Sequence, residues 1–250
     1  MAPIVKEITA KSVLSKTGIP GERYCINPYV GCAHACRYCY ATFMRRFTGH
    51  TVPWGSFVDV KVNAPDVLKR ELRRAERGGI IMSSVTDPYQ PIESRYMLTR
   101  RCLDVLRLFQ FPIDILTKSP LVLRDKDILT RLEDVDVGMT ITTDNERMRM
   151  LFEPCAPPIK ERIDALRDLH NMGIRTYAFI GPVLPMNPDV LARLLMPHVD
   201  SVLIDRMNYH EKVKWIYKRY KIEQWLDDDF INGIIKRLES LFDEKEVEVC

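Results

Sequence analysis

Three cysteines crowded into a short segment are the residues of this chain whose types and spacing most clearly suggest chemistry. Cys32, Cys36 and Cys39 stand in the segment GCAHACRYCY, with the spacing CxxxCxxC. A structural zinc site takes four ligands and a disulfide takes two, so three thiols suit neither. An iron-sulfur cube contains four irons, and three cysteines would leave one iron without a protein ligand. The pattern therefore predicts a cluster with one iron open to chemistry.

Zinc is the alternative metal for this segment, with His34 as its fourth ligand. Neighbouring ligands in so short a loop would strain a tetrahedral zinc site, which argues against that arrangement. We therefore expect His34 to lie near the cluster without binding it.

The overall composition restricts the class of protein only loosely. Lysine and arginine total 37 against 34 aspartate and glutamate, and a net charge of +3 requires no polyanionic partner. No apolar run approaches the roughly 20 residues that span a bilayer, and the first residues lack the layout of a signal peptide. We expect a cytoplasmic protein, in which cysteines serve as ligands, catalytic groups or small buried residues rather than disulfide partners.

Apolar runs typical of strands alternate with stretches of helical periodicity after the cysteine segment. Strands are expected at residues 79–84, 111–116, 135–141, 175–180 and 201–204, and helices at 97–109, 127–132, 159–172 and 187–195. This alternation favours parallel strands, and about six strands are too few for a complete eight-unit barrel. We expect an α/β fold: an N-terminal arm (1–23), a partial (β/α)6 barrel of parallel strands (24–208) and a C-terminal helical extension (209–250).

Polar residues follow each of the expected strands. In parallel β/α barrels the active site gathers at the carboxyl ends of the strands. The candidates for the lining of a site are Ser83, Ser84, Thr86, Asp87, Thr117, Lys118, Thr140, Thr142, Thr143, Gly181, Asp205, Arg206 and Asn208.

Several segments together resemble one family. Tyr38 places an aromatic residue before the last cysteine of the triad, as in the radical S-adenosylmethionine (radical SAM) superfamily. Within that superfamily the chain is similar to the spore photoproduct lyase-like group over roughly residues 24–205. The matching segments are NPYVGC (27–32), CRYCYA (36–41), TKS (117–119), TITT (140–143), FEP (152–154), Arg162 and GPVLPMN (181–187).

The resemblance implies an enzyme in which the three cysteines hold a 4Fe-4S cluster and S-adenosylmethionine chelates the fourth iron. An external one-electron reductant, flavodoxin-like or ferredoxin-like, would reduce the cluster. The cofactor would then be cleaved to a 5'-deoxyadenosyl radical that abstracts hydrogen from a substrate. The substrate is left open, because the barrel and the cofactor residues specify how a radical is made rather than where it goes.

The resemblance also assigns roles to residues on two strands. Lys118 matches a lysine that contacts the carboxylate of S-adenosylmethionine, although a surface lysine at a strand end is the alternative. Thr140 matches a hydroxyl position that faces the cofactor, with Thr142 as a second candidate. Ordinary β-branched strand residues are the alternative for both threonines.

Four further residues are candidate cofactor contacts by the same resemblance. Ser84 and Asp87 lie where the family binds the methionine amine, and Tyr38 is expected near the adenine. Gly181 would let the backbone approach a ligand closely, but Gly-Pro is equally a turn.

The chain departs from spore photoproduct lyase at the hydrogen donor. In that lyase a cysteine just after the second strand returns a hydrogen atom to the repaired thymine, whereas residues 81–85 here read IMSSV. Tyr40 does match a tyrosine of the lyase's radical relay and is the candidate catalytic residue. We expect neither Cys102, on the apolar side of a helix, nor Cys155, in a proline-rich loop, to replace the donor.

A basic and aromatic segment near the C-terminus offers a function of another class. Lys212–Lys221 interleaves cations with aromatic rings, and Trp225 follows it, a composition that suits a nucleic acid. The alternative function is therefore a nucleic-acid-binding or repair protein in which the cluster, or a zinc, is structural. We favour an amphipathic helix, with Val213, Ile216, Tyr217 and Tyr220 packed and Lys214, Lys218 and Lys221 solvated.

Overall fold

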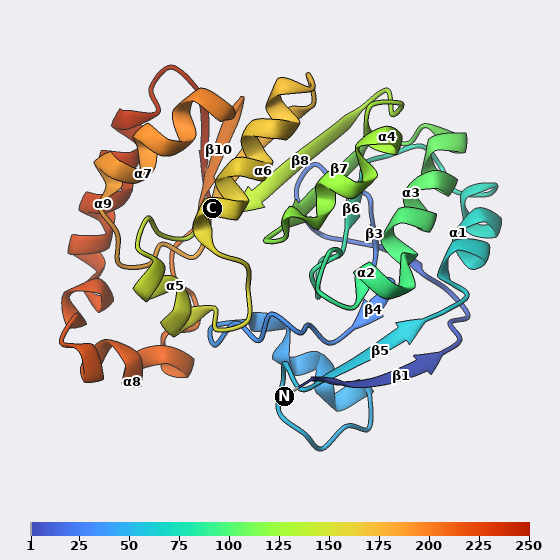
Figure 1. The fold of residues 1–250 in the computed structure, drawn as a ribbon, viewed down its shortest axis with the longest axis horizontal. Helices are drawn as coiled ribbons and strands as arrows, with labels where there is room; N and C mark the ends of the chain where they lie inside the picture. The colour runs from blue at the N-terminus through green and yellow to red at the C-terminus, as the bar shows by residue number, and fades with distance from the viewer. Residues whose placement is uncertain (1) are drawn as a thin grey trace.

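The computed structural model describes residues 2–250, and an eight-stranded sheet forms its centre (Figure 1). The strands are Leu14–Lys16 (β2), Tyr24–Ile26 (β3), Ile80–Met82 (β6), Ile113–Thr117 (β7), Val135–Thr140 (β8), Arg175–Ile180 (β9), Ser201–Ile204 (β10) and Glu246–Val249 (β11). Their order across the sheet is β11-β10-β9-β8-β7-β6-β3-β2, and all neighbours are parallel except β2 and β3. Within residues 2–250 the edge strands β2 and β11 do not pair, so the sheet is an open partial barrel. The expected α/β fold with an incomplete parallel barrel is confirmed.

Helices connect the strands and lie along the outside of the sheet (Figure 1). The α-helices are Ala64–Leu72 (α1), Glu93–Tyr96 (α2), Leu98–Phe109 (α3), Lys126–Leu129 (α4), Glu146–Phe152 (α5), Ile159–Asn171 (α6), Pro188–Leu195 (α7), His210–Tyr220 (α8) and Asp228–Leu241 (α9). Short 3-10 helices span Tyr40–Phe47 (η1), Pro120–Asp125 (η2), Met196–His198 (η3) and Glu223–Leu226 (η4). None of the helices formed by residues 2–250 has the length and apolar content required to cross a bilayer.

Helix α6 shows how an amphipathic pattern places a polar residue inside the fold. Ile159, Ala165, Leu166 and Leu169 recur at helical spacing and are buried, and α6 packs on β8 and β9. Arg162 belongs to the same buried face. A guanidinium in this position needs a buried partner, because an unpaired charge in an apolar core is strongly destabilising.

Side chains alternate between the two faces of the sheet, so every second residue of β8 and β9 lies on the same face. Gly138 pairs with Tyr177 across β8 and β9, and two residues later Thr140 pairs with Phe179. A Cβ atom on Gly138 would lie 2.1 Å from the Tyr177 ring, so that ring occupies the space beside the glycine. Thr140 and Phe179 lie one step nearer the strand ends, on the same face.

A second, three-stranded sheet leads into the cysteine loop. It consists of Ile4–Ile8 (β1), Phe57–Lys61 (β5) and Tyr29–Val30 (β4), in the order β1-β5-β4. Gly31 follows β4 directly and has a φ of +91°, and a Cβ there would lie 2.4 Å from the Phe57 carbonyl oxygen. Only glycine therefore fits the turn that carries the chain from this sheet to Cys32.

The C-terminal segment is more than the expected helical extension. It forms α8 and α9, but residues 246–249 then add β11 to the main sheet beside β10. The sequence there reads Glu-Val-Glu-Val, and such alternation is a strand pattern that the charged helical residues before it obscured.

Candidate active site

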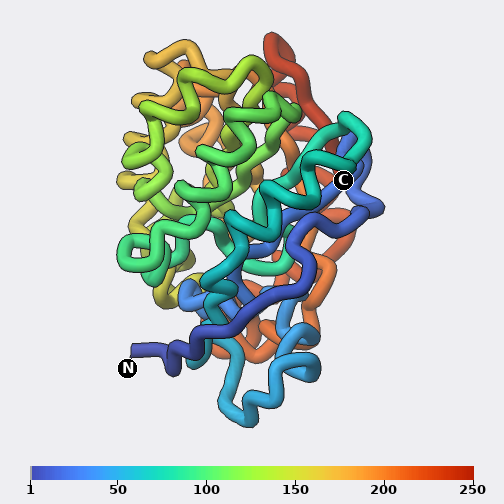
Figure 2. Tube along the Cα trace, turned by 90° about the vertical axis from the view of Figure 1, so that its right-hand side faces the viewer, coloured from blue at the N-terminus to red at the C-terminus, as the bar shows by residue number. Residues whose placement is uncertain are grey.

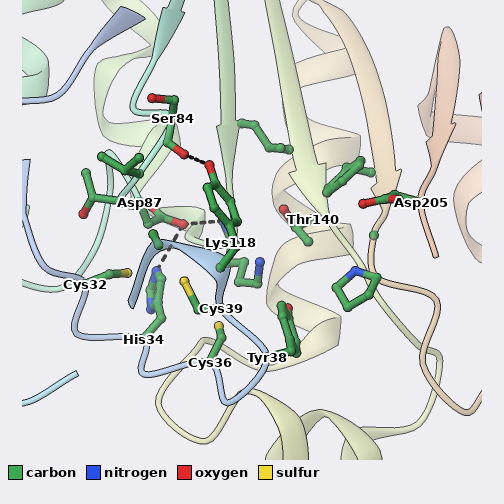
Figure 3. Close-up of a pocket in the computed structure, with 18 of the residues that line it drawn as sticks. Cys32, His34, Cys36, Tyr38, Cys39, Ser84, Asp87, Lys118, Thr140 and Asp205 are labelled. Carbon is green, nitrogen blue, oxygen red and sulfur yellow. Dashed lines mark hydrogen bonds and ion pairs between the residues drawn. The ribbon is translucent and has the colours of Figure 1, made fainter. Parts of the chain in front are cut away.

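A cavity of about 330 Å³ opens where the strands β6 to β10 end and the cysteine loop covers them (Figure 3). Its volume lies within the range of about 300 to 1,000 Å³ that is common for small-molecule sites. The predicted site residues that line it are Cys32, Cys36, Tyr38, Cys39, Tyr40, Ser84, Asp87, Lys118, Thr140 and Gly181. The structure thus brings together these residues from five separate parts of the chain, whereas the candidates Thr117, Thr142 and Thr143 are not among the residues that line the cavity.

The cysteine loop presents its three thiols along one side of this cavity (Figure 3). Two tight turns shape it: the Ala35 N–H donates to the Cys32 carbonyl at 3.3 Å, and the Cys39 N–H donates to the Cys36 carbonyl at 3.2 Å. Burial, with smaller contributions from Asp87 and Cys39, raises the pKa of the Cys32 thiol to about 12. Burial also raises the pKa values of the other two thiols, an effect that a bound metal would reverse.

Among residues 2–250 no three His, Cys, Asp or Glu side chains converge closely enough to hold one metal ion. Cys32, Cys36 and Cys39 nevertheless line one cavity, and in an iron-sulfur cube each cysteine would bind a different iron.

His34 and Asp87 form a buried pair beside Cys32. The His34 Nε2 atom lies 3.3 Å from Asp87 Oδ2, and Asp87 accepts hydrogen bonds from the Tyr89 N–H, the Thr117 hydroxyl and the Lys118 N–H. Burial alone would raise the pKa of Asp87, but His34, the Thr117 hydroxyl and the Lys118 N–H lower it to about 2. The carboxylate is therefore charged, and its oxygens are largely occupied by protein donors, which leaves little capacity to accept from the methionine amine predicted to bind there.

A buried ionic cluster lies behind Lys118 and Tyr38. The Glu153 carboxylate accepts from the Tyr38 hydroxyl and, at 3.2 Å, from the Thr142 hydroxyl. Its other oxygen lies 2.6 Å from the Arg162 Nη2 atom, and both side chains are fully buried. Lys118 Nζ lies 3.8 Å from Glu153 and 5.9 Å from the Tyr38 ring centroid. Thr142 therefore supports this cluster rather than the cavity wall.

The electrostatics keep the members of this cluster charged. Burial would raise the pKa of Glu153, but Arg162 and Lys118 outweigh it and hold that pKa below its ordinary value. Burial would lower the pKa of Lys118, but Glu153 outweighs it and holds that pKa above its ordinary value. An ammonium group therefore faces the cavity beside Cys36.

Glu153 and Arg162 were not predicted to have a role in the site, although both stand in segments that carry the resemblance. The signal that could have found them is the position of Arg162 on the apolar face of α6, since a buried arginine requires a buried acid. No local pattern identifies Glu153 as that acid.

Tyr40, the candidate catalytic residue, bridges two sides of the cavity. Its hydroxyl donates to the Ser84 carbonyl, and its ring stacks on Tyr209 with centroids 6.4 Å apart at an interplanar angle of 20°. Burial, with Cys39 and Tyr209, raises the pKa of Tyr40 to about 12, so the phenol keeps its proton at neutral pH.

Thr140 and Gly181 both line the cavity, but each also has a structural role. The Thr140 carbonyl accepts from Arg162 Nη1 at 3.0 Å, which ties the end of β8 to the buried ionic cluster. A Cβ on Gly181 would lie 2.2 Å from the Phe179 ring. A side chain at position 181 would therefore require the Phe179 ring to move, whether or not a ligand approaches the glycine.

The segment after β10 completes the wall. Asp205, Arg206 and Asn208 line the cavity, as expected of polar residues at a strand end, and Met207 and Tyr209 line it as well. Burial raises the pKa of Asp205 above its ordinary value.

Helix α8 is fixed to the cysteine loop through one cation. Lys212 Nζ donates to the Cys39 carbonyl at 2.6 Å and to the Thr42 hydroxyl at 2.8 Å, and it lies 4.9 Å from the Tyr209 ring centroid. Val213, Ile216 and Tyr217 are buried beneath the helix. The basic segment thus packs as the favoured interpretation predicted, and one of its cations is not free for phosphate.

Replacing Lys212 with methionine is expected to loosen the cysteine loop. The loss of two hydrogen bonds from a charged donor should lower the free energy of unfolding by about 1.5 to 3 kcal/mol or more, measured by urea denaturation of the metal-free protein. Lys214→Met is the matched control, because Lys214 is exposed and pairs with Glu211 on its own helix. Equal effects of the two substitutions would contradict a specific role for Lys212.

Comparison with known proteins places the chain in a family. A sequence profile of the Radical SAM superfamily matches residues 26–195. The chain is also 44% identical over 184 residues to an uncharacterized protein of Methanocaldococcus jannaschii, which covers 74% of this chain and 69% of that protein. The chain belongs to the radical SAM superfamily. It is therefore a radical SAM enzyme, as the cysteine triad predicted.

Two further similarities relate this radical SAM enzyme to proteins with named activities. A structure of spore photoproduct lyase with dinucleoside spore photoproduct superposes with a TM-score of 0.70 at 14% identity, over 98% of this chain and 81% of that one. Another structure of that lyase contains bound AdoMet and has a TM-score of 0.65. A radical SAM Nα-GlyT isomerase of Pseudomonas phage M6 is 26% identical over 201 residues, covering 80% of this chain but 40% of that protein. The shared fold with the lyase confirms the predicted structural resemblance.

Proposed function

We propose that Cys32, Cys36 and Cys39 hold a 4Fe-4S cluster and that the cavity beside them binds S-adenosylmethionine together with a substrate. When bound, these groups supply a 5'-deoxyadenosyl radical that abstracts a hydrogen atom from the substrate. The observation that carries this proposal is the gathering of the three thiols, an ammonium group and several hydroxyl groups around one cavity, in a chain of the radical SAM superfamily.

Some residues of the cavity position the cofactor, and others exclude water. Lys118 presents a charge suited to the cofactor's carboxylate, held in place by Glu153. Ser84, which follows β6, and Thr140, at the end of β8, offer hydroxyl groups to the cavity. Apolar side chains such as Ile81, Leu116 and Phe179 line the same space and would keep water from a reactive species.

Tyr40 is proposed to face the substrate rather than S-adenosylmethionine. Its ring lies against Tyr209, which comes from the segment after β10, so two phenols border the opening of the cavity. Binding of nucleic acid by Lys212–Lys221 stays a prediction, and the engagement of Lys212 with the cysteine loop does not favour it.

Replacing Lys118 with methionine is expected to weaken binding of S-adenosylmethionine by about tenfold or more, because one charge-assisted contact is worth about 1.5 to 3 kcal/mol. Isothermal titration of the reconstituted protein measures the dissociation constant. Lys126→Met, an exposed lysine at the start of α4, is the control and should leave it unchanged. An unchanged affinity in Lys118→Met would remove Lys118 from the cofactor site.

The proposed function is tested by anaerobic reconstitution with iron and sulfide, followed by dithionite and S-adenosylmethionine. We expect brown protein that forms 5'-deoxyadenosine and methionine. Retention of zinc in place of iron, with the cofactor left intact, would disprove the proposal.

A further inference from the structure

We propose that the exposed surface of η1, formed by Phe43, Arg45, Arg46 and Phe47, is the docking surface for an acidic one-electron carrier protein of the flavodoxin or ferredoxin kind. This inference rests on the proposed function, since a carrier is needed only if the thiols hold a redox cluster. The name "η1 surface" is used below for these four residues.

The η1 surface lies in the least acidic part of the chain. Residues 23–58 contain four arginines and no aspartate or glutamate, although the whole chain has 34 acidic residues. A patch of one sign attracts a partner of the opposite sign and speeds its association. The partner for this patch is therefore anionic.

The η1 surface also exposes large apolar rings, as the surfaces of protein interfaces do. Phe43 and Phe47 are 41% and 68% exposed, and Phe47 is the more exposed of the two by a wide margin. Among residues 2–250 the exposed aromatic side chains are Tyr40, Phe43 and Phe47 in η1, Tyr209 directly before α8 and Trp215 within α8. Exposed aromatic rings together with arginine are characteristic of protein interfaces.

The position of η1 suits electron transfer to the proposed cluster. The helix begins at Tyr40, directly after the ligand Cys39, and Lys212 bonds to both the Cys39 carbonyl and Thr42 within it. Two orthogonal views show this light-blue segment at the lower margin of the molecule, projecting from the body (Figures 1 and 2). A partner seated there would approach the cysteine loop without entering the cavity.

One arginine of the η1 surface lies against both of its phenylalanine rings. The Arg46 guanidinium carbon lies 5.5 Å from the Phe43 ring centroid and 4.8 Å from that of Phe47. The guanidinium therefore lies over one face of each ring, which leaves less aromatic surface for stacking of a nucleic-acid base. The geometry instead presents a planar fork of donors on an apolar base, which suits the carboxylates of an acidic protein.

The electron balance of the step is simple. The reduced carrier loses one electron and the oxidised cluster on the three cysteines gains it. No bond forms or breaks and no proton moves. Interfaces for such transfer are commonly small and transient, so a few residues can dominate the encounter.

The test compares two reductants on the same reconstituted protein, dithionite and enzymatically reduced flavodoxin, with 5'-deoxyadenosine as the product measured. We expect Arg46→Glu and Arg45→Glu to lower the flavodoxin-supported rate at least about tenfold at low salt, and the dithionite-supported rate less than about twofold. Arg77→Glu, an exposed arginine in the loop after α1, is the matched control and should leave both rates unchanged. Titration with oxidised flavodoxin should show the same loss of binding in the two η1 variants, independently of catalysis.

Three outcomes would overturn this inference. Unchanged flavodoxin-supported rates and binding in both η1 variants would place docking elsewhere. A parallel loss with both reductants would make Arg45 and Arg46 structural. Binding of an oligonucleotide, but not of flavodoxin, to the η1 surface would assign that surface to a nucleic acid. If the native protein forms no 5'-deoxyadenosine with dithionite, the proposed function fails instead, and the flavodoxin titration still decides the docking surface.

Discussion

Cys36→Ala is expected to lose its iron-sulfur colour and at least about 100-fold of its 5'-deoxyadenosine formation, since even changes around a metal's ligands cost 10- to 100-fold. Two thiols cannot hold a cube that needs three protein ligands and an open iron. Cys36 also faces the cavity beside Lys118, where a retained cluster would have to sit. Iron content and the absorbance of the reconstituted protein measure the effect directly.

Cys155→Ser is the matched control for this prediction. Cys155 is exposed, and its backbone N–H donates to the His34 carbonyl at 3.3 Å, so it lies next to the cysteine loop without belonging to the triad. We expect this variant to bind iron and to turn over as the native chain does. Iron loss in Cys155→Ser, with iron retained in Cys36→Ala, would show that the wrong thiols have been assigned.

Glu153→Leu is expected to destabilise the protein by about 3 to 5 kcal/mol, the usual effect of removing one partner from a buried ion pair. The substitution leaves the fully buried Arg162 without its carboxylate, Lys118 without its ion-pair partner and the Tyr38 hydroxyl without its acceptor. For a chain of this size the melting temperature should fall by about 10 °C or more. Chemical denaturation of the metal-free protein separates this effect from any loss of cofactor.

Two further variants sharpen the test of the ionic cluster. Glu153→Leu combined with Arg162→Met removes both charges and should recover part of the lost stability, because an unpaired buried charge costs more than an absent pair. Asp164→Asn breaks exposed ion pairs with Lys160 and Arg167 on α6, and we expect little change from it. A loss in Glu153→Leu no greater than that in Asp164→Asn would contradict the proposed importance of the buried cluster.

The barrel and the cysteine triad could be predicted from the sequence because the patterns that indicate them are local. The strands β7 to β10 each follow a stretch of helical periodicity, and the spacing of the cysteines is contained in one loop. The positions of polar residues at strand ends then predicted the wall of the cavity, since parallel strands bring their carboxyl ends together.

The features that could not be predicted from the sequence depend on contacts between residues far apart in the chain. Lys212 reaches the Cys39 carbonyl across 173 positions, and Tyr38 reaches Glu153 across 115. Thr140 and Thr142 have similar local patterns, yet β8 ends at Thr140, and the chain then turns Thr142 towards Glu153. β11 was missed because its four residues follow a long charged helix, and its pairing with β10 gives no local signal.

The most direct test of the account is electron paramagnetic resonance of the dithionite-reduced, reconstituted protein, recorded with and without S-adenosylmethionine. An open iron that binds the cofactor predicts the signal of a reduced 4Fe-4S cluster whose shape changes when S-adenosylmethionine is added. The Lys118→Met variant should need more cofactor for the same change. A signal that does not respond to the cofactor, or a protein that takes up no iron through Cys32, Cys36 and Cys39, would contradict the central claim.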